Sequence, residues 1–237
     1  QAYGFSGMRI QNGSAAFSGG GLRLTGGTLT INQCVIANNV GASSGGGLSV
    51  VSTTTTITNT TFSGNSAGLQ GSAINAQGSA LTISNSTFSG NQATATNGGA
   101  GAIYHFANGQ SMTLTNVTFA GNTSASLFGG GSALVSQNPG SYRNTIFSGQ
   151  SPQITGSGAS SLGNNICSDG SGNLSAADDL PNTNPLLSAL GNYGGQTPTL
   201  ALLPGSPAIN AGTATGAPAS DQRGIARVGT TDIGAFE

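Results

Sequence analysis

The chain has 237 residues, of which 35% are hydrophobic and only 5% charged, and its formal net charge is −1. It contains no run of 18 apolar residues, which excludes a transmembrane helix and membrane insertion. It also contains no lysine and no cluster of its five arginines, so nucleic acid is not an expected partner. Its abundance of Gly, Thr, Ser and Asn resembles the composition of secreted, cell-surface proteins.

Residues 1–4 lack the charged and apolar regions of a signal peptide, so we expect that a leader was removed or omitted. Residues 5–11 are typical of a strand and not of an amphipathic helix that would cap a solenoid. An uncapped first rung would expose Phe5, Met8 and Ile10 together with open backbone groups. Such an end could stack on the tail of a second molecule and form a head-to-tail filament.

One phrase recurs along the first two-thirds of the chain, and its clearest copy spans residues 81–91. It consists of an apolar-Thr/Ser-apolar triplet, an Asn, a Phe and a second Asn, and it follows a glycine-rich turn and a short apolar run. Ile36, Phe62 and Phe88 are 26 residues apart, and intervals of 31 and 28 residues lead to Phe119 and Phe147. Such a period indicates a solenoid. Apolar positions alternate with period two and glycines number 41, so we predict an all-β parallel β-helix over residues 1–150.

Stacking the rungs about 4.8 Å apart places like residues above like. The Phe positions would form an inner stack, and the Asn positions would form two ladders in which side-chain amides bond from rung to rung. The first predicted ladder contains Asn39, Asn65, Asn91 and Asn122. The second contains Gln33, Asn59, Asn85, Asn116 and Asn144.

A second periodic feature is a row of Thr residues on one strand of each rung. Alternation points these side chains outward, where they would form a flat array of hydroxyl and methyl groups. The predicted array contains Thr28, Thr30, Asn32, Thr54, Thr56, Thr58, Thr82, Ser84, Thr113 and Thr115. Two interpretations stay open: Thr is a favourable residue on any exposed strand, or the array binds a repetitive surface such as glycan or ice.

The β-helix fold includes polysaccharide lyases and pectin-degrading hydrolases, so catalysis must be considered. Residues 1–168 contain no Asp and no Glu, whereas glycosidases use two carboxylates and lyases of this fold use carboxylate-held calcium. His105 has no partner fixed by a motif, which favours a packing or surface role over a catalytic one. We therefore predict a protein that is not an enzyme and has no cofactor.

Two further features leave alternatives open. Cys34 and Cys167 lie in the first and beyond the fifth rung, so they are either separate thiols or bridged through a folded-back tail or between molecules. The segment that starts at Asp169 has Leu174 and Leu180 where an EF-hand has Gly and Glu. It is either a solvated turn or a looser calcium site, whose candidate ligands are Asp169, Asn173, Asp178 and Asp179.

From about Ser151 the repeat fades, and seven of the eight prolines lie between Pro152 and Pro218, which predicts C-terminal rungs and an irregular cap over residues 151–237. This region contains the motifs of residues 184–187, 192–199 and 203–212, and it ends in residues 221–224 and 232–237. These motifs and the GGG-L and T-F-S-G-N repeats closely resemble the choice-of-anchor Q domain family of bacterial extracellular proteins. The resemblance implies a right-handed parallel β-helix at the cell surface. Asp221, Arg223 and Asp232 are expected to form a buried charge cluster that fixes the cap.

We accordingly expect a non-enzymatic, secreted structural or adhesive protein of a bacterial cell surface or extracellular matrix, with self-assembly as its mode of action. Its partners would be copies of itself or matrix glycans. The first alternative is a binding module for glycan or ice that uses the Thr array. The second alternative is a carbohydrate-active enzyme.

Overall fold

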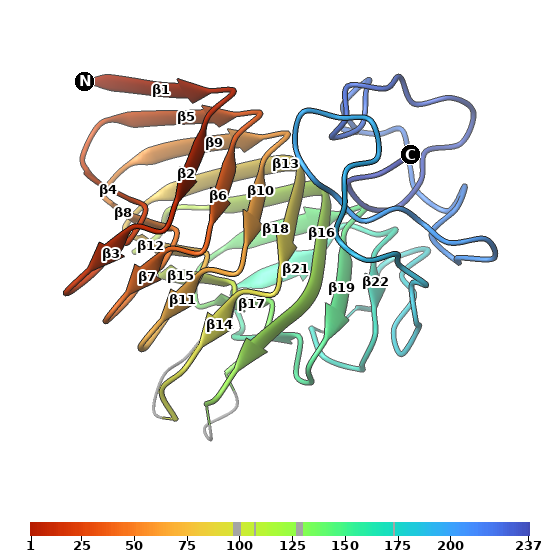
Figure 1. Cartoon of the computed structure of the whole chain (residues 1–237). Coiled ribbons are helices and arrows are strands. Elements are labelled where there is room, and N and C mark those ends of the chain that lie inside the picture. The colour runs from red at the N-terminus through yellow and green to blue at the C-terminus, as the bar shows by residue number, and fades with distance from the viewer. Residues whose placement is uncertain (97–100, 107, 127–129, 173) are drawn as a thin grey trace.

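The computed structural model describes residues 1–96, 101–106, 108–126, 130–172 and 174–237. Within these ranges all regular elements are β-strands, and every pairing between strands is parallel. The strands stack as a right-handed β-solenoid, which confirms the predicted fold class. Figure 1 shows the stack beginning with β1, β2 and β3 at one end, with the C-terminal residues near the other.

Each turn of the solenoid contributes strands to several faces. The face that we call the threonine face contains β1 (Ala2–Ser6), β5 (Thr28–Asn32), β9 (Thr54–Thr58), the first half of β13 (Ala80–Ser89), the start of β16 (Met112–Ser124), β18 (Gly140–Arg143) and β21 (Ala159–Ser161). The next face, which we call the tail face, contains β2 (Arg9–Gln11), β6 (Val35–Ala37), β10 (Thr61–Ser63), the second half of β13, the middle of β16, β19 (Ile146–Gly149) and β22 (Ile166–Cys167).

Two further rows of strands close the coil. A narrow row contains β3 (Ser14–Ala15), β7 (Val40–Gly41), β11 (Ser66–Ala67), β14 (Gln92–Ala93) and the end of β16. The back sheet contains β4 (Leu22–Thr25), β8 (Leu48–Val51), β12 (Ile74–Gln77), β15 (Ile103–Phe106), β17 (Leu134–Ser136) and β20 (Ile154–Thr155). The glycine-rich turns lead into this sheet; at Gly71 the backbone has φ +58°, and a Cβ would lie 2.2 Å from the carbonyl oxygen of Ile74.

The core is built from columns of identical or similar side chains. Phe62, Phe88, Phe119 and Phe147 are fully buried, and their ring centroids are 4.9, 4.8 and 5.1 Å apart with interplanar angles of 15° or less. Ile36 precedes this stack in register, and Cys167 follows it. The spacing equals the strand separation, so the 26-residue sequence period converts directly into a stacked core.

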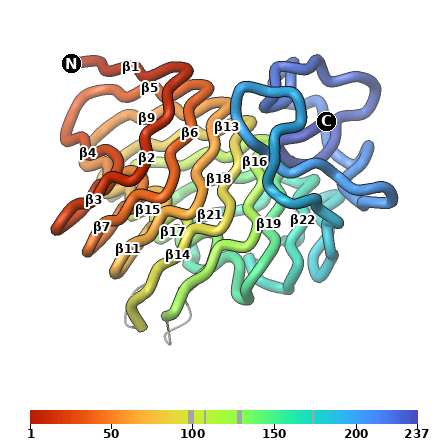
Figure 2. Tube along the Cα trace, in the orientation of Figure 1, coloured from red at the N-terminus to blue at the C-terminus, as the bar shows by residue number. Residues whose placement is uncertain are grey.

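Beyond β22 the parallel ladder takes one more step, in which Leu180 pairs with Ile166. The chain then becomes the C-terminal tail, which we define as residues 184–237. Its bridges are short and antiparallel, at Leu187 with Leu202, Gly191 with Thr199 and Ser220 with Ala226. Figure 2 shows the tail folded back beside β13 and β16. Residues 151–180 thus contain further rungs, formed by β20 to β22 and the step at Leu180. The irregular tail packs along the side of several rungs as well as near the end of the stack.

Candidate functional surfaces

The first Asn set forms a continuous ladder inside the solenoid. Asn39 Nδ2 donates to Asn65 Oδ1 at 3.0 Å, Asn65 to Asn91 at 2.9 Å, and Asn91 to Asn122 at 2.9 Å. Each of these oxygens also accepts the backbone N–H of the Asn one rung earlier, at 3.0–3.1 Å. All four side chains are at most 1% exposed. The ladder satisfies the polar groups of a buried turn, so these residues are structural.

The second Asn set does not form the predicted ladder. Of its members, only Asn144 and Asn116 bond to each other, at 3.3 Å. All of them have positive φ, between 44° and 53°, at the corner between the threonine face and the tail face. Asn is favoured in this left-handed conformation. The prediction of a second ladder was wrong: Asn59 Nδ2 donates to Asn32 Oδ1, and the side chains of Asn85, Asn116 and Asn144 donate to the tail.

A different ladder, one residue further along the chain, occupies the interior of that corner. The backbone N–H of Cys34 donates to Thr60 Oγ1 at 3.3 Å, and that of Thr60 donates to Ser86 Oγ at 3.2 Å. Later in the chain, the N–H of Thr145 donates to Asn165 Oδ1 at 2.9 Å. The members differ in residue type, so the sequence pattern did not reveal this ladder. The shared signal is a small polar residue directly after Asn59, Asn85 and Asn144, whereas Val117 follows Asn116.

The tail binds the solenoid through hydroxyl groups that point outward from the tail face. Gln222 is central to this contact: its Nε2 donates to Thr61 Oγ1 at 2.9 Å, and its Oε1 accepts from Thr87 Oγ1 at 2.6 Å. On the next rung, Thr118 Oγ1 accepts the backbone N–H of Ala235 at 3.0 Å. Gln222 is 2% exposed. The three Thr residues occupy equivalent positions on successive rungs, so the tail recognises a column of hydroxyls.

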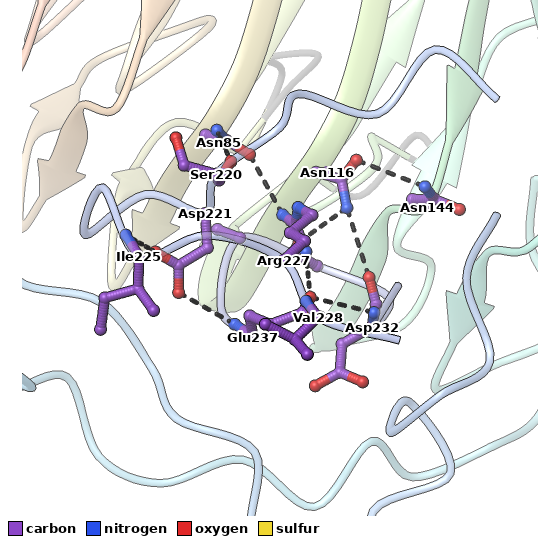
Figure 3. A network of polar contacts seen from close by, with 12 residues as sticks. Asn85, Asn116, Asn144, Ser220, Asp221, Ile225, Arg227, Val228, Asp232 and Glu237 are labelled. Atoms are coloured by element: carbon purple, nitrogen blue, oxygen red, sulfur yellow. Dashed lines mark hydrogen bonds and ion pairs between the residues drawn. The ribbon is translucent and has the colours of Figure 1, made fainter. Parts of the chain in front are cut away.

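The outward corner residues form the second row of tail contacts (Figure 3). Asn85 Nδ2 donates to the carbonyl oxygen of Ser220 at 2.7 Å, and Asn116 Nδ2 donates to that of Gly234 at 3.2 Å. Asn144 Nδ2 donates to the carbonyl oxygen of Thr213 at 2.8 Å. Three of the residues predicted to form the second ladder, Asn85, Asn116 and Asn144, therefore attach the tail.

Charges within the tail are paired. Asp221 and Arg223 form an ion pair at 2.7 Å, and the Arg223 guanidinium lies 3.6 Å from the ring centroid of Phe236. Asp232 does not join this pair: its Oδ1 accepts the backbone N–H of Asn210, and burial raises the pKa of its carboxyl group above the ordinary value. A second ion pair, of Arg227 with Glu237 at 2.7 Å, was not foreseen from the sequence.

The threonine face is a flat array in strict register. In the central outward column Thr30, Thr56, Thr82 and Thr113 pair rung by rung. Thr28 and Thr54 pair beside them, but Ala80 interrupts their column. The third column contains Asn32, Thr58, Ser84 and Thr115, of which Thr58 Oγ1 donates to Asn32 Oδ1 at 2.9 Å. The predicted array thus lies on one sheet, and its first two columns carry no charge.

The first rung exposes residues whose equivalents are buried. Phe5 and Ile10 are partly exposed, whereas the residues that pair with them one rung later, Ile31 and Ile36, are fully buried. The same holds on the back sheet, where Leu22 and Leu24 are partly exposed. Met8 is 49% exposed. A hollow of about 310 Å³ between β1 and β4 is lined by Tyr3, Phe5, Leu22, Arg23, Leu24 and Leu29.

Of the four residues proposed for a loose calcium site, the structure describes Asp169, Asp178 and Asp179, and these three do not form a group that could hold a metal ion. Asp169 accepts from the Ser171 hydroxyl and the backbone N–H of Gln153. Burial raises the pKa of its carboxyl group, but hydrogen bonds from Ser171, Cys167 and Ser151 together outweigh burial and lower that pKa below its ordinary value. Asp179 accepts from the backbone N–H groups of Asn165 and Ala176. Asp178 is exposed, and Asn173 lies outside the described residues. Among those residues, no group of three or more His, Cys, Asp or Glu side chains could hold a metal ion.

His105 lies inside the coil, on the back sheet. Its side chain is fully buried, its Nδ1 lies 3.3 Å from Ser136 Oγ, and its Nε2 lies 3.2 Å from the carbonyl oxygen of Ser79. Burial lowers the pKa of the imidazole below its ordinary value. These contacts describe a packed, neutral side chain at a corner of the coil.

Both cysteines are buried free thiols. Cys34 Sγ donates to the carbonyl oxygen of Asn32 at 3.2 Å, and Cys167 Sγ donates to Asp169 Oδ1 at 3.1 Å. They occupy rungs near opposite ends of the solenoid. Burial raises the pKa of Cys167 to about 12, which keeps this thiol protonated and unreactive.

In the described ranges no helix is long and apolar enough to cross a membrane. Comparison of the sequence with models of known protein families and with curated proteins finds no match.

Proposed function

We propose that the protein is a non-enzymatic, secreted structural or adhesive component of a bacterial cell surface or extracellular matrix, and that it self-assembles end to end. The observation that carries this proposal is the exposed first rung. Phe5, Ile10, Leu22 and Leu24 contact the core, yet each retains surface that the next rung covers at every later position. Covering this apolar surface and pairing the open edge of β1 would favour association.

Composition supports an extracellular role without catalysis. Residues 1–168, which form all the rungs up to β22, contain no Asp or Glu, so these rungs offer no carboxylate pair for glycoside cleavage. Low charge and many hydroxyl side chains suit a component of a matrix, where the stacked core and the Asn ladder supply rigidity.

Electron microscopy and light scattering of the purified chain test this proposal. We expect rods longer than one molecule for the wild type, and dispersed monomers for Met8→Asp, which places a charge on the open end. Leu69→Asp is the matched control, because Leu69 is an exposed aliphatic residue on the third rung, away from either end. Wild-type protein that stays monomeric at high concentration would refute self-assembly.

The threonine face supports a second candidate function, binding to a repetitive neutral surface such as glycan or ice. The supporting observation is the strict register of Thr30, Thr56, Thr82 and Thr113. Retention on insoluble polysaccharide and shaping of ice crystals are the two assays. Loss of either activity in Thr56→Tyr/Thr82→Tyr, with folding unchanged, would assign it to this face, whereas no activity in the wild type would remove this candidate.

A further inference from the structure

Charges are segregated along the axis of the solenoid. Arg9 and Arg23 are both exposed on the first rung, on two different faces. At the opposite end, Asp169, Asp178 and Asp179 follow the last strand, β22. Asp221 pairs with Arg223 and Arg227 with Glu237, while Arg143 on β18 and Asp232 form hydrogen bonds with backbone groups of the tail. Apart from the charges in these tail contacts, the first rung is basic and the last steps of the stack are acidic.

The acidic end continues the geometry of the rungs. The corner between the threonine face and the tail face has positive φ at successive steps, namely Gly7, Gln33, Asn59, Asn85, Asn116, Asn144, Asn164 and Asp178. The N–H of Asn164 donates to the carbonyl oxygen of Ala177, as that of Asn59 does to Ser84 one rung on. The N–H of Asn165 donates to Asp179 Oδ1 at 3.0 Å, which continues the inner ladder. Residues 178–180 are thus the last step of the solenoid.

Within this last step, Asp178 is the carboxylate placed for an external partner. Asp169 and Asp179 accept hydrogen bonds from backbone groups that close the end of the rod, whereas Asp178 is exposed. Apolar surface lies nearby, because Leu180 belongs to a cluster with Leu187 and Leu202. The residues adjacent to that pair, Leu186 and Leu203, are 37% and 42% exposed.

We infer that the occupant of the acidic end is the basic first rung of a second copy, an inference that rests on the self-assembly proposed above. When the residue columns of the solenoid continue into the second copy, Gly7 of that copy stacks on Asp178, and its Arg9 stacks on Leu180. The Arg9 guanidinium then lies beside the Asp178 carboxylate. The backbone N–H of Arg9 meets the carbonyl oxygen of Asp179, as that of Val35 meets Met8 within the chain at 2.8 Å.

Charge favours contact between the first rung of one copy and the last step of another over contact between two first rungs. Contact between two first rungs would bring Arg9 and Arg23 of both copies together, and juxtaposed like charges oppose association. A contact between unlike ends does not close, so it produces an open filament. Eight corner steps at the strand separation give an axial repeat of about 38 Å per molecule.

The test is charge reversal at each end of the full chain, with the critical concentration for assembly measured by light scattering in about 0.01 M salt, where charges are least screened. Arg9→Asp and Asp178→Arg should each raise the critical concentration by about tenfold, because reversal replaces an attraction with a repulsion. The double variant Arg9→Asp/Asp178→Arg should recover wild-type assembly. Gln92→Arg, on the exposed side of β14, is the control that adds positive charge away from both ends.

Outcomes distinguish this inference from the function on which it rests. Wild-type filaments with the 38 Å repeat and rescue in the double variant support both. Assembly that persists in both single variants, or that Arg9→Asp strengthens, overturns the pairing of unlike ends and leaves self-assembly standing. Wild-type protein that forms no assemblies overturns both.

Discussion

Asn65 donates its Nδ2 hydrogen to Asn91 Oδ1 at 2.9 Å, and the backbone N–H of Asn65 donates to the same oxygen at 3.1 Å. Asn91 Nδ2 in turn donates to the carbonyl oxygen of Phe62 and to Asn122 Oδ1. The buried side-chain amide of Asn91 thus forms hydrogen bonds with groups on the rungs before and after its own. Its neighbours have no access to solvent that could replace it.

Removing that amide should destabilise the whole solenoid. Asn91→Ala removes the acceptor of two buried N–H groups of Asn65 and the donor to the carbonyl oxygen of Phe62 and to Asn122 Oδ1, so we expect a loss of about 3–5 kcal/mol in the free energy of unfolding. Chemical denaturation measures the effect. Gln92→Ala, the exposed neighbour on β14, should change stability by less than about 0.5 kcal/mol. Equal effects of the two substitutions would contradict the ladder's importance.

Gln222 should control whether the tail stays attached. Gln222→Ala removes its hydrogen bonds to Thr61, Thr87, Thr197 and Pro198, so we expect the contact to weaken by about 2–4 kcal/mol. Hydrogen exchange and limited proteolysis should then show opening of residues 184–237 before the rungs. Gln196→Ala is the control, because Gln196 is exposed in the same tail. Simultaneous opening of tail and rungs in Gln222→Ala would show that the tail is not a separate unit.

His105 should make stability depend on pH. Burial lowers the pKa of the folded imidazole, so below the ordinary value, near 6.5, the unfolded chain takes up a proton that the folded chain does not. The contribution of the neutral imidazole to the free energy of unfolding is fully present above that pH and is lost as the pH falls. The loss is at most about 2 kcal/mol at pH 5. His105→Gln removes it, so thermal unfolding at pH 7.5 and pH 5 should show a smaller acid loss in the variant. The same loss in both proteins would disprove the assignment.

The two thiols should be inert in the folded protein. Both are buried, and burial raises the pKa of Cys167 to about 12, so a thiol reagent at pH 8 should label neither until the chain unfolds. Cys34→Ser should cost less than about 1 kcal/mol, because Thr60 and Ser86 occupy the same column and make the same hydrogen bond to the carbonyl two residues earlier. Fast labelling of the native protein would indicate that an end of the rod opens.

The threonine face and the stacked phenylalanines were predictable because both depend on local alternation and on a constant period. Phe62 to Phe88 is 26 residues in the sequence and one strand separation in space, so register follows directly from counting. The first Asn ladder follows from the same count.

The sequence by itself determined the rungs, since a period of 26 residues with apolar alternation can bury its Phe and Asn columns only by stacking. The tertiary structure alone decided where the tail binds and which corner Asn residues contact it. Gln222 meets Thr61 across 161 residues, and Asn85 meets Ser220 across 135. Contacts of that separation have no period, and the left-handed backbone that directs the amides of Asn85, Asn116 and Asn144 toward the tail is a property of the folded turn.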